Sequence, residues 1–289
     1  MVNYNPKTWV IHILSLHKSD TIRILWKELV SIALLTSLLT YLEITYLENA
    51  SWMKDLMAVY SLVGFVLSLL LVFRTNTGYD RWWEGRKRWG ELVNNTRNLA
   101  IKIAVTTIPD SDKAYLGRMI SNYPKALKEH LRNGVKLEVL KLEEQETIEF
   151  IQKEHVPNEI AKRIYHRLHA LKLSGALSEM DVLMMDTNLK TFSDIAGACE
   201  RIKNTPIPYS YSLFLKKFIF IYVTTMPLAF VSSFGYWSIL LTTFVFYVLV
   251  SMEVLAEEIE DPFGTDENDL STDELAKKIQ TNVDEILAP

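Results

Sequence analysis

Cysteine is almost absent from this sequence, since Cys199 is the only one among 289 residues. One thiol excludes a disulfide within the chain, and a metal site would have to draw on other residue types. A surplus of one charge sign is missing as well: charged residues make up 23% of the chain, and the net charge is only −4. This balance gives no reason to expect a nucleic-acid partner or a disordered acidic block.

Motifs that carry common enzyme chemistry are also missing. We find no nucleophile paired with a base, no glycine-rich phosphate loop and no His-Glu-x-x-His metal motif. His166 and His169 stand three apart on an expected helix and could share a metal, but their setting is more typical of an exposed basic helix face. The sequence therefore predicts a protein that is not an enzyme and requires no cofactor.

Long apolar runs are what the sequence has instead, at residues 29–46, 52–73, 218–234 and 237–256. A helix needs about 20 apolar residues to cross the ~30 Å hydrocarbon layer of a bilayer. We therefore expect four transmembrane helices arranged as two hairpins, with turns near residues 47–51 and at Gly235. Pro227 predicts a kink in the third helix, because neighbouring helices in a membrane can satisfy the carbonyl that proline leaves unpaired.

Between the two hairpins lies a long region rich in charge. Its apolar residues recur at helical spacing, as in Leu116, Ile120 and Tyr123. This spacing predicts amphipathic helices that pack together in water. No run of alternating β-branched residues predicts a sheet, so the expected fold is all-α. The expected parts of this single integrated domain are an N-terminal segment with the first helical pair (1–74), a cytosolic helical region (75–212), the second helical pair (213–256) and an acidic cytosolic tail (257–289).

Lysine and arginine lie on one side of the apolar runs. They precede the first run, follow the second and precede the third, whereas the only basic residue near the two hairpin turns is Lys54, at the start of the second run. By the positive-inside rule, both termini and the middle region lie in the cytoplasm, and membrane lipid is an expected partner. No small-residue cleavage site follows the short apolar stretch near the N-terminus, so we expect no removable signal peptide.

Three separated motifs flank the apolar runs. They read Arg-Thr-Asn-Thr-Gly-Tyr-Asp-Arg-Trp-Trp (74–83), Asn-Thr-Pro-Ile-Pro-Tyr (204–209) and Leu-Ala-Glu-Glu-Ile-Glu-Asp-Pro-Phe-Gly (255–264). Together with four membrane runs split two and two, the chain resembles the bestrophin family of ion channels over nearly its whole length, and its prokaryotic members most. The resemblance implies a homopentamer around a central pore that passes small monatomic ions, in the inner membrane of a bacterium.

Phe65, Leu69 and Phe73 recur at every fourth position of the second run, on one helix face. Spacing alone favours a packing or lipid-facing stripe. The resemblance instead implies that they line the hydrophobic neck of the pore, which apolar rings can close by dewetting. It also implies a second constriction at Met180, at the cytosolic exit, where Ser178 is the expected N-cap of a helix. Without the resemblance, Met180 would be read as a core methionine.

The segment after Pro-Phe-Gly forms a calcium clasp in eukaryotic bestrophins. In this chain Asp266 and Asp269 stand at the matching carboxylate positions, and Glu258 and Asp261 stand where the family uses carbonyl oxygens. Calcium takes six to eight oxygen ligands, which such a set could supply. Prokaryotic members are not expected to be gated by calcium, and acidic residues near Pro and Gly are common in solvated turns. We therefore treat these four residues as candidate ligands and expect no calcium requirement.

The selected ion and one alternative of another class stay open at this point. Eukaryotic relatives conduct chloride and other anions, whereas some prokaryotic ones prefer sodium and other monovalent cations. Similarity to the prokaryotic members favours a cation channel, with an anion (chloride) channel as the alternative. A membrane-anchored helical scaffold or sensor, in which the cytosolic helices bind a partner, would fit the same hydrophobic runs.

Overall fold

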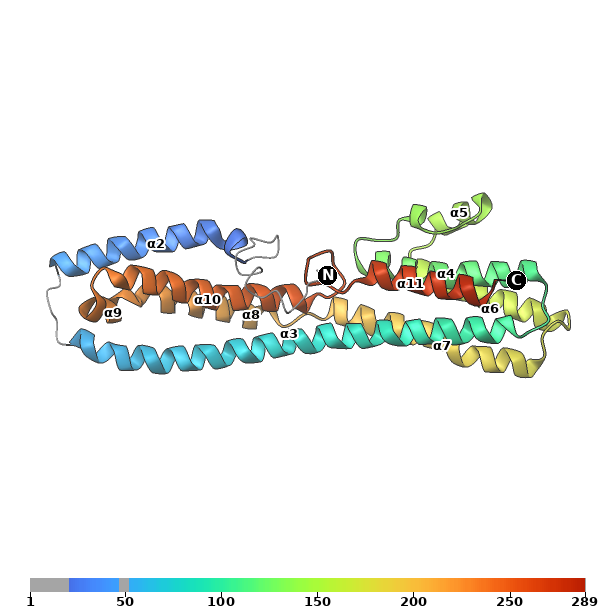
Figure 1. Cartoon of the computed structure of the whole chain (residues 1–289), viewed down its shortest axis with the longest axis horizontal. Helices are drawn as coiled ribbons and strands as arrows, with labels where there is room; N and C mark the ends of the chain where they lie inside the picture. Colours follow the sequence, from blue (N-terminus) through green and yellow to red (C-terminus); the bar gives the residue numbers. More distant parts are fainter. Residues whose placement is uncertain (1–20, 47–51, 289) are drawn as a thin grey trace. The chain divides into compact units, whose positions relative to one another are not determined.

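A computed structural model of the protein describes residues 21–46 and 52–288. The N-terminal segment and the first hairpin turn lie outside these residues. All regular secondary structure in these described residues is helical, which confirms the predicted all-α fold. The helices are α2 Thr21–Tyr46, α3 Trp52–Ala104, α4 Asp110–Leu131, η2 Leu137–Val139 (3₁₀), α5 Glu144–Ile151, α6 Val156–Leu173, α7 Glu179–Asn204, α8 Tyr209–Thr225, α9 Pro227–Phe234, α10 Trp237–Glu260 and α11 Thr272–Ile286 (Figure 1).

Four helical stretches are long and apolar enough to cross a membrane. They are Thr21–Tyr46, Leu56–Ala104, Tyr209–Phe234 and Trp237–Glu260. The first apolar run is thus extended by eight residues at its N-terminal end, and the third begins nine residues earlier than the apolar pattern indicates. The four predicted membrane helices are confirmed: three spans contain the whole run that predicted them, and the second span contains residues 56–73 of its run.

The chain forms two compact units. Of the described residues, the first unit contains 21–46, 52–81, 206–261 and 266–268, and the second contains 82–205, 262–265 and 269–288. In the first unit α2 lies along α10 and also contacts α8 and α9 (Figure 1). Its core is built from the following residues: Ile32, Leu67, Leu71, Leu215, Ile219, Val223, Phe246 and Leu249.

Buried hydroxyl groups join α2 to α10 in the first unit. The Oγ1 of Thr40 and the Oγ of Ser238 lie 3.2 Å apart, and the Oγ of Ser251 donates to the Oγ1 of Thr21 at 2.8 Å. Lipid tails are as apolar as leucine, so helices in a bilayer associate through close packing and such polar contacts, each contributing about 0.6 kcal/mol. Of the two acidic side chains in α2, Glu28 is exposed near the start of the helix, and Glu43 is buried inside the unit, which is compatible with a membrane crossing.

The third apolar run is divided at its proline. α8 ends at Thr225 and α9 begins at Pro227, with Met226 between them at helical backbone angles. Proline suits the first position of a helix, because the N–H that it lacks would have no partner there. α9 ends at Gly235, whose φ of +52° favours glycine, and α10 starts two residues later. Where the sequence predicted a kink within one helix at Pro227, the structure has two helices that meet there, and the predicted turn at Gly235 is confirmed.

α3 continues far beyond the apolar run, as one helix of 53 residues (Figure 1). The apolar pattern ends at Arg74, but the following polar stretch contains no proline that would stop a helix. Its glycine at position 78 serves close packing, because a Cβ there would lie 3.0 Å from the carbonyl oxygen of Ala256 in α10. The change from apolar to polar residues therefore marks a change of environment along a single helix.

The second unit is a bundle of amphipathic helices around one core. α4 packs against α6, α7 and α11, and α6 packs against α7. Leu116, Ile120 and Tyr123 of α4 are fully buried, as their spacing predicts. The Tyr123 hydroxyl donates a hydrogen bond to the backbone oxygen of Phe192 at 2.6 Å, and burial raises the pKa of that hydroxyl. The predicted helical packing of this region is confirmed.

Candidate functional site

One face of α3 in the first unit is apolar and uncovered. Phe65, Leu69 and Phe73 are 68%, 45% and 56% exposed, whereas Leu67 and Leu71 are almost fully buried. Each residue turns an α-helix by about 100°, so residues four apart share a face and residues two apart point to nearly opposite sides. α3 therefore turns Leu67 and Leu71 into the core of its own unit and leaves the predicted neck residues facing outward.

Among the four candidate spans, α3 has the least cover from its own chain. Only 11% of its most apolar window is buried, compared with 39% for the span Tyr209–Phe234. An uncovered apolar face of this length must contact lipid, another copy of the chain or the lumen of a pore. Other apolar residues of α3 are exposed too, including Leu62, Val66 and Val72. α3 is thus the span with the largest uncovered share among the four, and exposure does not by itself choose among these surroundings.

A buried polar network holds α3 directly after the last predicted neck residue. Arg74 is 1% exposed, and its Nη2 donates to the Oε2 of Glu260 at 2.6 Å. The other carboxylate oxygen of Glu260 accepts from the backbone N–H of Ile207 at 2.5 Å, and its backbone oxygen accepts from the Nε of Arg81 at 3.0 Å. Each of the three sequence motifs thus contributes a member of this network. Sequence reasoning identified the motifs but missed these roles, because no local spacing pairs residues 186 positions apart.

Met180 lies in the first turn of α7, in the second unit. Ser178 is the N-cap, as predicted: its Oγ accepts from the backbone N–H of Asp181 at 3.1 Å. Hydrogen bonds from the Ser178 hydroxyl and backbone N–H also hold the pKa of Asp181 below its usual range. The Met180 side chain is 62% exposed, whereas Met185 is buried. Met180 is therefore not a core methionine within this subunit, and its role as a pore constriction stays a prediction.

The four candidate calcium ligands have different surroundings. In the first unit Asp266 is exposed, Asp261 follows the end of α10, and the Oε2 of Glu258 accepts from the Nδ2 of Asn268 at 2.6 Å. In the second unit Asp269 is 2% exposed, and a Cβ added to Gly264 would lie 2.7 Å from its Oδ2. The buried carboxylate of Asp269 thus explains a glycine at position 264 by close packing. Calcium binding by these residues stays a prediction.

A comparison with known protein families identifies the family of this chain. Residues 1–285 match the family described as Bacterial/Fungal Bestrophin protein. The chain belongs to the bestrophin family. This confirms the resemblance found in the sequence, and because bestrophins are membrane ion channels, it confirms an integral membrane protein that is not an enzyme.

Curated relatives and solved structures agree with this membership. The voltage-dependent anion channel-forming protein alr2987 of Nostoc sp. is 36% identical over 77% of this bestrophin and 75% of the relative. The voltage-dependent anion channel-forming protein YneE of Escherichia coli K12 is 31% identical over 80% of this chain and 76% of the relative. A bacterial bestrophin homologue from Klebsiella pneumoniae superposes with a TM-score of 0.80 at 25% identity, covering 89% of this chain and 97% of that one.

Proposed function

We propose that this bestrophin assembles as a homopentamer in the bacterial inner membrane and forms an anion channel. The observation that carries the proposal is the uncovered apolar face of α3 in a chain whose curated relatives are named anion channel-forming proteins. Those names favour the chloride alternative over the sodium selectivity that we expected from the sequence. We therefore replace the expected cation selectivity with anion selectivity and retain the predicted pore residues.

In such an assembly, five copies of α3 would surround the pore axis. Phe65, Leu69 and Phe73 would then form three successive apolar rings, which the exposure of all three side chains allows. Apolar rings restrict a pore by excluding water, and conduction requires the rings to widen or to be wetted. The buried Arg74–Glu260 pair would fix each helix at the end of this neck. Met180 would form a second, wider constriction in the cytosolic region.

Phenylalanine gives an apolar neck a physical basis for preferring anions. An aromatic ring has a negative face and a positive edge. Rings of Phe65 and Phe73 that turn their edges toward the axis would present partial positive charge to a passing ion. Leu69 has no comparable quadrupole, so we assign the selectivity to the two phenylalanine rings. We assign the restriction of the neck to all three side chains.

The arrangement across the membrane follows from the charges at the ends of the helices. Arginine and lysine cluster around the cytosolic end of the apolar part of α3 and before α8. α11, close to the C-terminus, packs against α4 of the charged helical region. The C-terminus would therefore lie on the same cytoplasmic side as this region, and an even number of crossings would put the N-terminus there too.

Reversal potentials test the proposal directly. Purified protein in a planar bilayer, with a tenfold gradient of potassium chloride, should reverse close to the chloride equilibrium potential, about 59 mV from zero. Replacing chloride with a large organic anion on the dilute side should shift the reversal potential further from zero, whereas replacing potassium should have little effect. Reversal near the potassium potential would overturn the anion assignment. Absence of flux from intact purified oligomers would instead favour a membrane-anchored scaffold or sensor.

A further inference from the structure

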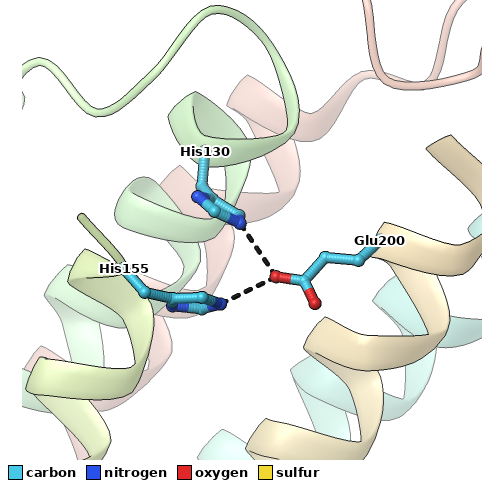
Figure 2. Close-up of side chains that lie close together, drawn as sticks. All are labelled: His130, His155 and Glu200. Carbon is cyan, nitrogen blue, oxygen red and sulfur yellow. Dashed lines mark hydrogen bonds and ion pairs between the residues drawn. The ribbon is translucent and has the colours of Figure 1, made fainter. Parts of the chain in front are cut away.

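Three side chains in the second unit converge on one point. His130 lies in the last turn of α4, His155 is the N-cap of α6, and Glu200 lies in α7. The Nε2 atoms of the two histidines lie 2.8 and 2.7 Å from the same atom, the Oε1 of Glu200 (Figure 2). Within the described part of the chain, this is the group of histidine, cysteine and acidic residues whose ligand atoms all fall within 4.8 Å of one another.

The geometry is close to that of a coordinated metal ion. Zinc binds histidine nitrogen and carboxylate oxygen at about 2.0–2.2 Å, so two ligand atoms of a tetrahedral zinc ion lie roughly 3.3 Å apart. Each Nε2 of the cluster would need to move away from Oε1 by roughly half an ångström to admit an ion. The two imidazole rings lie 4.4 Å apart, centre to centre, and are tilted by 37°, so both already turn a nitrogen toward the carboxylate (Figure 2).

The charge of the cluster favours a cation. Glu200 forms no ion pair with lysine or arginine among the residues that the structure describes, and its hydrogen-bond partners there are the two histidines. With both imidazoles neutral, the group carries one negative charge. The three side chains are 23%, 31% and 29% exposed, so water can reach the cluster and supply a further ligand. Water could not reach a fully buried cluster.

The donor atoms favour a late first-row transition metal. Two imidazole nitrogens and one carboxylate suit zinc, whereas calcium and magnesium prefer oxygen ligands alone. The neighbouring thiol of Cys199 is buried and is not among the ligand atoms that converge on this point. A site with three protein ligands leaves a fourth tetrahedral position for water.

Metal binding would change one hydrogen bond at the start of α6. The Nδ1 of His155 accepts from the backbone N–H of Asn158 at 3.2 Å, so the neutral ring carries its proton on Nε2 and donates it to Glu200. Coordination through Nε2 requires the proton to move to Nδ1, which then no longer accepts from Asn158. The backbone N–H of Asn158 therefore reports on the ion, since it should exchange faster with solvent when the metal is bound.

We propose that His130, His155 and Glu200 form a zinc site that joins α4, α6 and α7 within the second unit. None of the three proposed zinc ligands is a proposed pore residue. Its occupancy depends neither on ion flux nor on the selected ion, so the proposal stands or fails separately from the channel function.

Zinc titration of the full-length, tag-free protein in detergent tests the site. After treatment with EDTA, we expect one zinc ion per subunit by calorimetry and a rise in melting temperature, while calcium and magnesium at the same concentration produce neither. Glu200→Gln keeps the size and an oxygen acceptor, and His155→Asn keeps a good N-cap. Each variant should lose at least tenfold in zinc affinity.

A matched control is available on the same helix. His166 and His169 are exposed on α6, so the variant His166→Asn/His169→Asn should bind zinc like the wild type. His12 and His17 stay in every variant, so zinc bound by them contributes equally to all titrations. Unchanged zinc affinity in Glu200→Gln, or no stoichiometric binding in the wild type, would overturn the proposal and leave a hydrogen-bonded cluster only. Native oligomer size and helix content in Glu200→Gln would show that loss of zinc does not reflect unfolding.

Discussion

The Nη2 of Arg74 and the Oε2 of Glu260 form a buried ion pair, 2.6 Å apart, between α3 and the end of α10. Arg74 directly follows Phe73, the last of the three predicted neck residues. Glu260 also accepts from the backbone N–H of Ile207, just before α8. One carboxylate therefore fixes three chain segments at the polar end of the membrane part.

Breaking this pair should destabilise the protein strongly. We expect Arg74→Met to cost about 3–5 kcal/mol, because it leaves the carboxylate of Glu260 buried without its partner. The double variant Arg74→Met/Glu260→Gln should recover part of that loss, since glutamine is neutral and keeps an acceptor for Ile207. Thermal unfolding in detergent measures the stability of the single variant and of the double variant. As a control, Lys190→Met breaks the exposed pair with Asp194 and should cost at most about 1 kcal/mol. Equal effects of the two single variants would contradict the structural role of Arg74.

Shrinking the neck should increase current. Phe65→Ala, Leu69→Ala and Phe73→Ala each remove an apolar ring that excludes water, so single-channel conductance should rise, most in the triple variant. Phe220→Ala in α8 and Leu34→Ala in α2 are matched controls, because both side chains are apolar and more than half exposed on other spans. We expect these controls to conduct like the wild type. Unchanged conductance in the triple variant would place the restriction elsewhere.

Met180 should affect the choice among ions of different size. A ring of methionine side chains is flexible, and Met180→Ala would widen it, so the permeability of large anions relative to chloride should rise. The matched control is Ile151→Ala in α5, which removes a similarly exposed apolar side chain of the second unit. Reversal potentials with anions of increasing size measure the ratio. Identical ratios for the wild type and Met180→Ala would refute the second constriction.

Calcium removal should leave this protein unchanged. We expect EGTA to alter neither the melting temperature nor the current of protein from which zinc has already been removed, in accordance with the expectation that calcium is not required. Asp266→Asn is the informative variant, because Asp266 is exposed and its replacement leaves the packing intact. A fall in melting temperature on chelation that disappears in Asp266→Asn would instead establish a calcium site.

Asp273 links the stability of the second unit to pH. Partial burial opposes its charged form, but hydrogen bonds from the Nζ of Lys128 and the Nη2 of Arg132 outweigh burial and lower its pKa. A carboxyl whose folded pKa is depressed stabilises above its unfolded pKa, near 3.9, and the contribution is lost as pH falls through the lower folded value. Asp273→Asn should lower the melting temperature at pH 7 and have little effect below the folded pKa. Since Asp273 is 62% exposed, the cost should be at most about 1 kcal/mol. An equal loss at all pH values would contradict this linkage.

Local sequence patterns were sufficient to predict the features of the fold that depend on whether a helix face contacts lipid, water or the protein core. Long apolar runs predicted four membrane helices, because crossing a bilayer requires a minimum apolar length that only helical segments of the right composition provide. Helical spacing predicted the buried face of α4, and Ser178 predicted the start of α7. Family motifs predicted the bestrophin assignment, whereas the proposal of an anion over a cation was inferred from the names of relatives and not from the neck sequence.

Other features depend on which helices come together, and only the tertiary structure decided them. The sequence drew attention to His166 and His169, whose spacing on one helix is visible locally, yet these two side chains are exposed. His130 and His155 stand 70 and 45 positions from Glu200, and they meet because α4, α6 and α7 pack around one core. Arg74 and Glu260 are likewise joined across 186 positions. Sequence periodicity reports the environment of a helix face, whereas a pair of side chains on different helices is fixed only when packing sets the position of both.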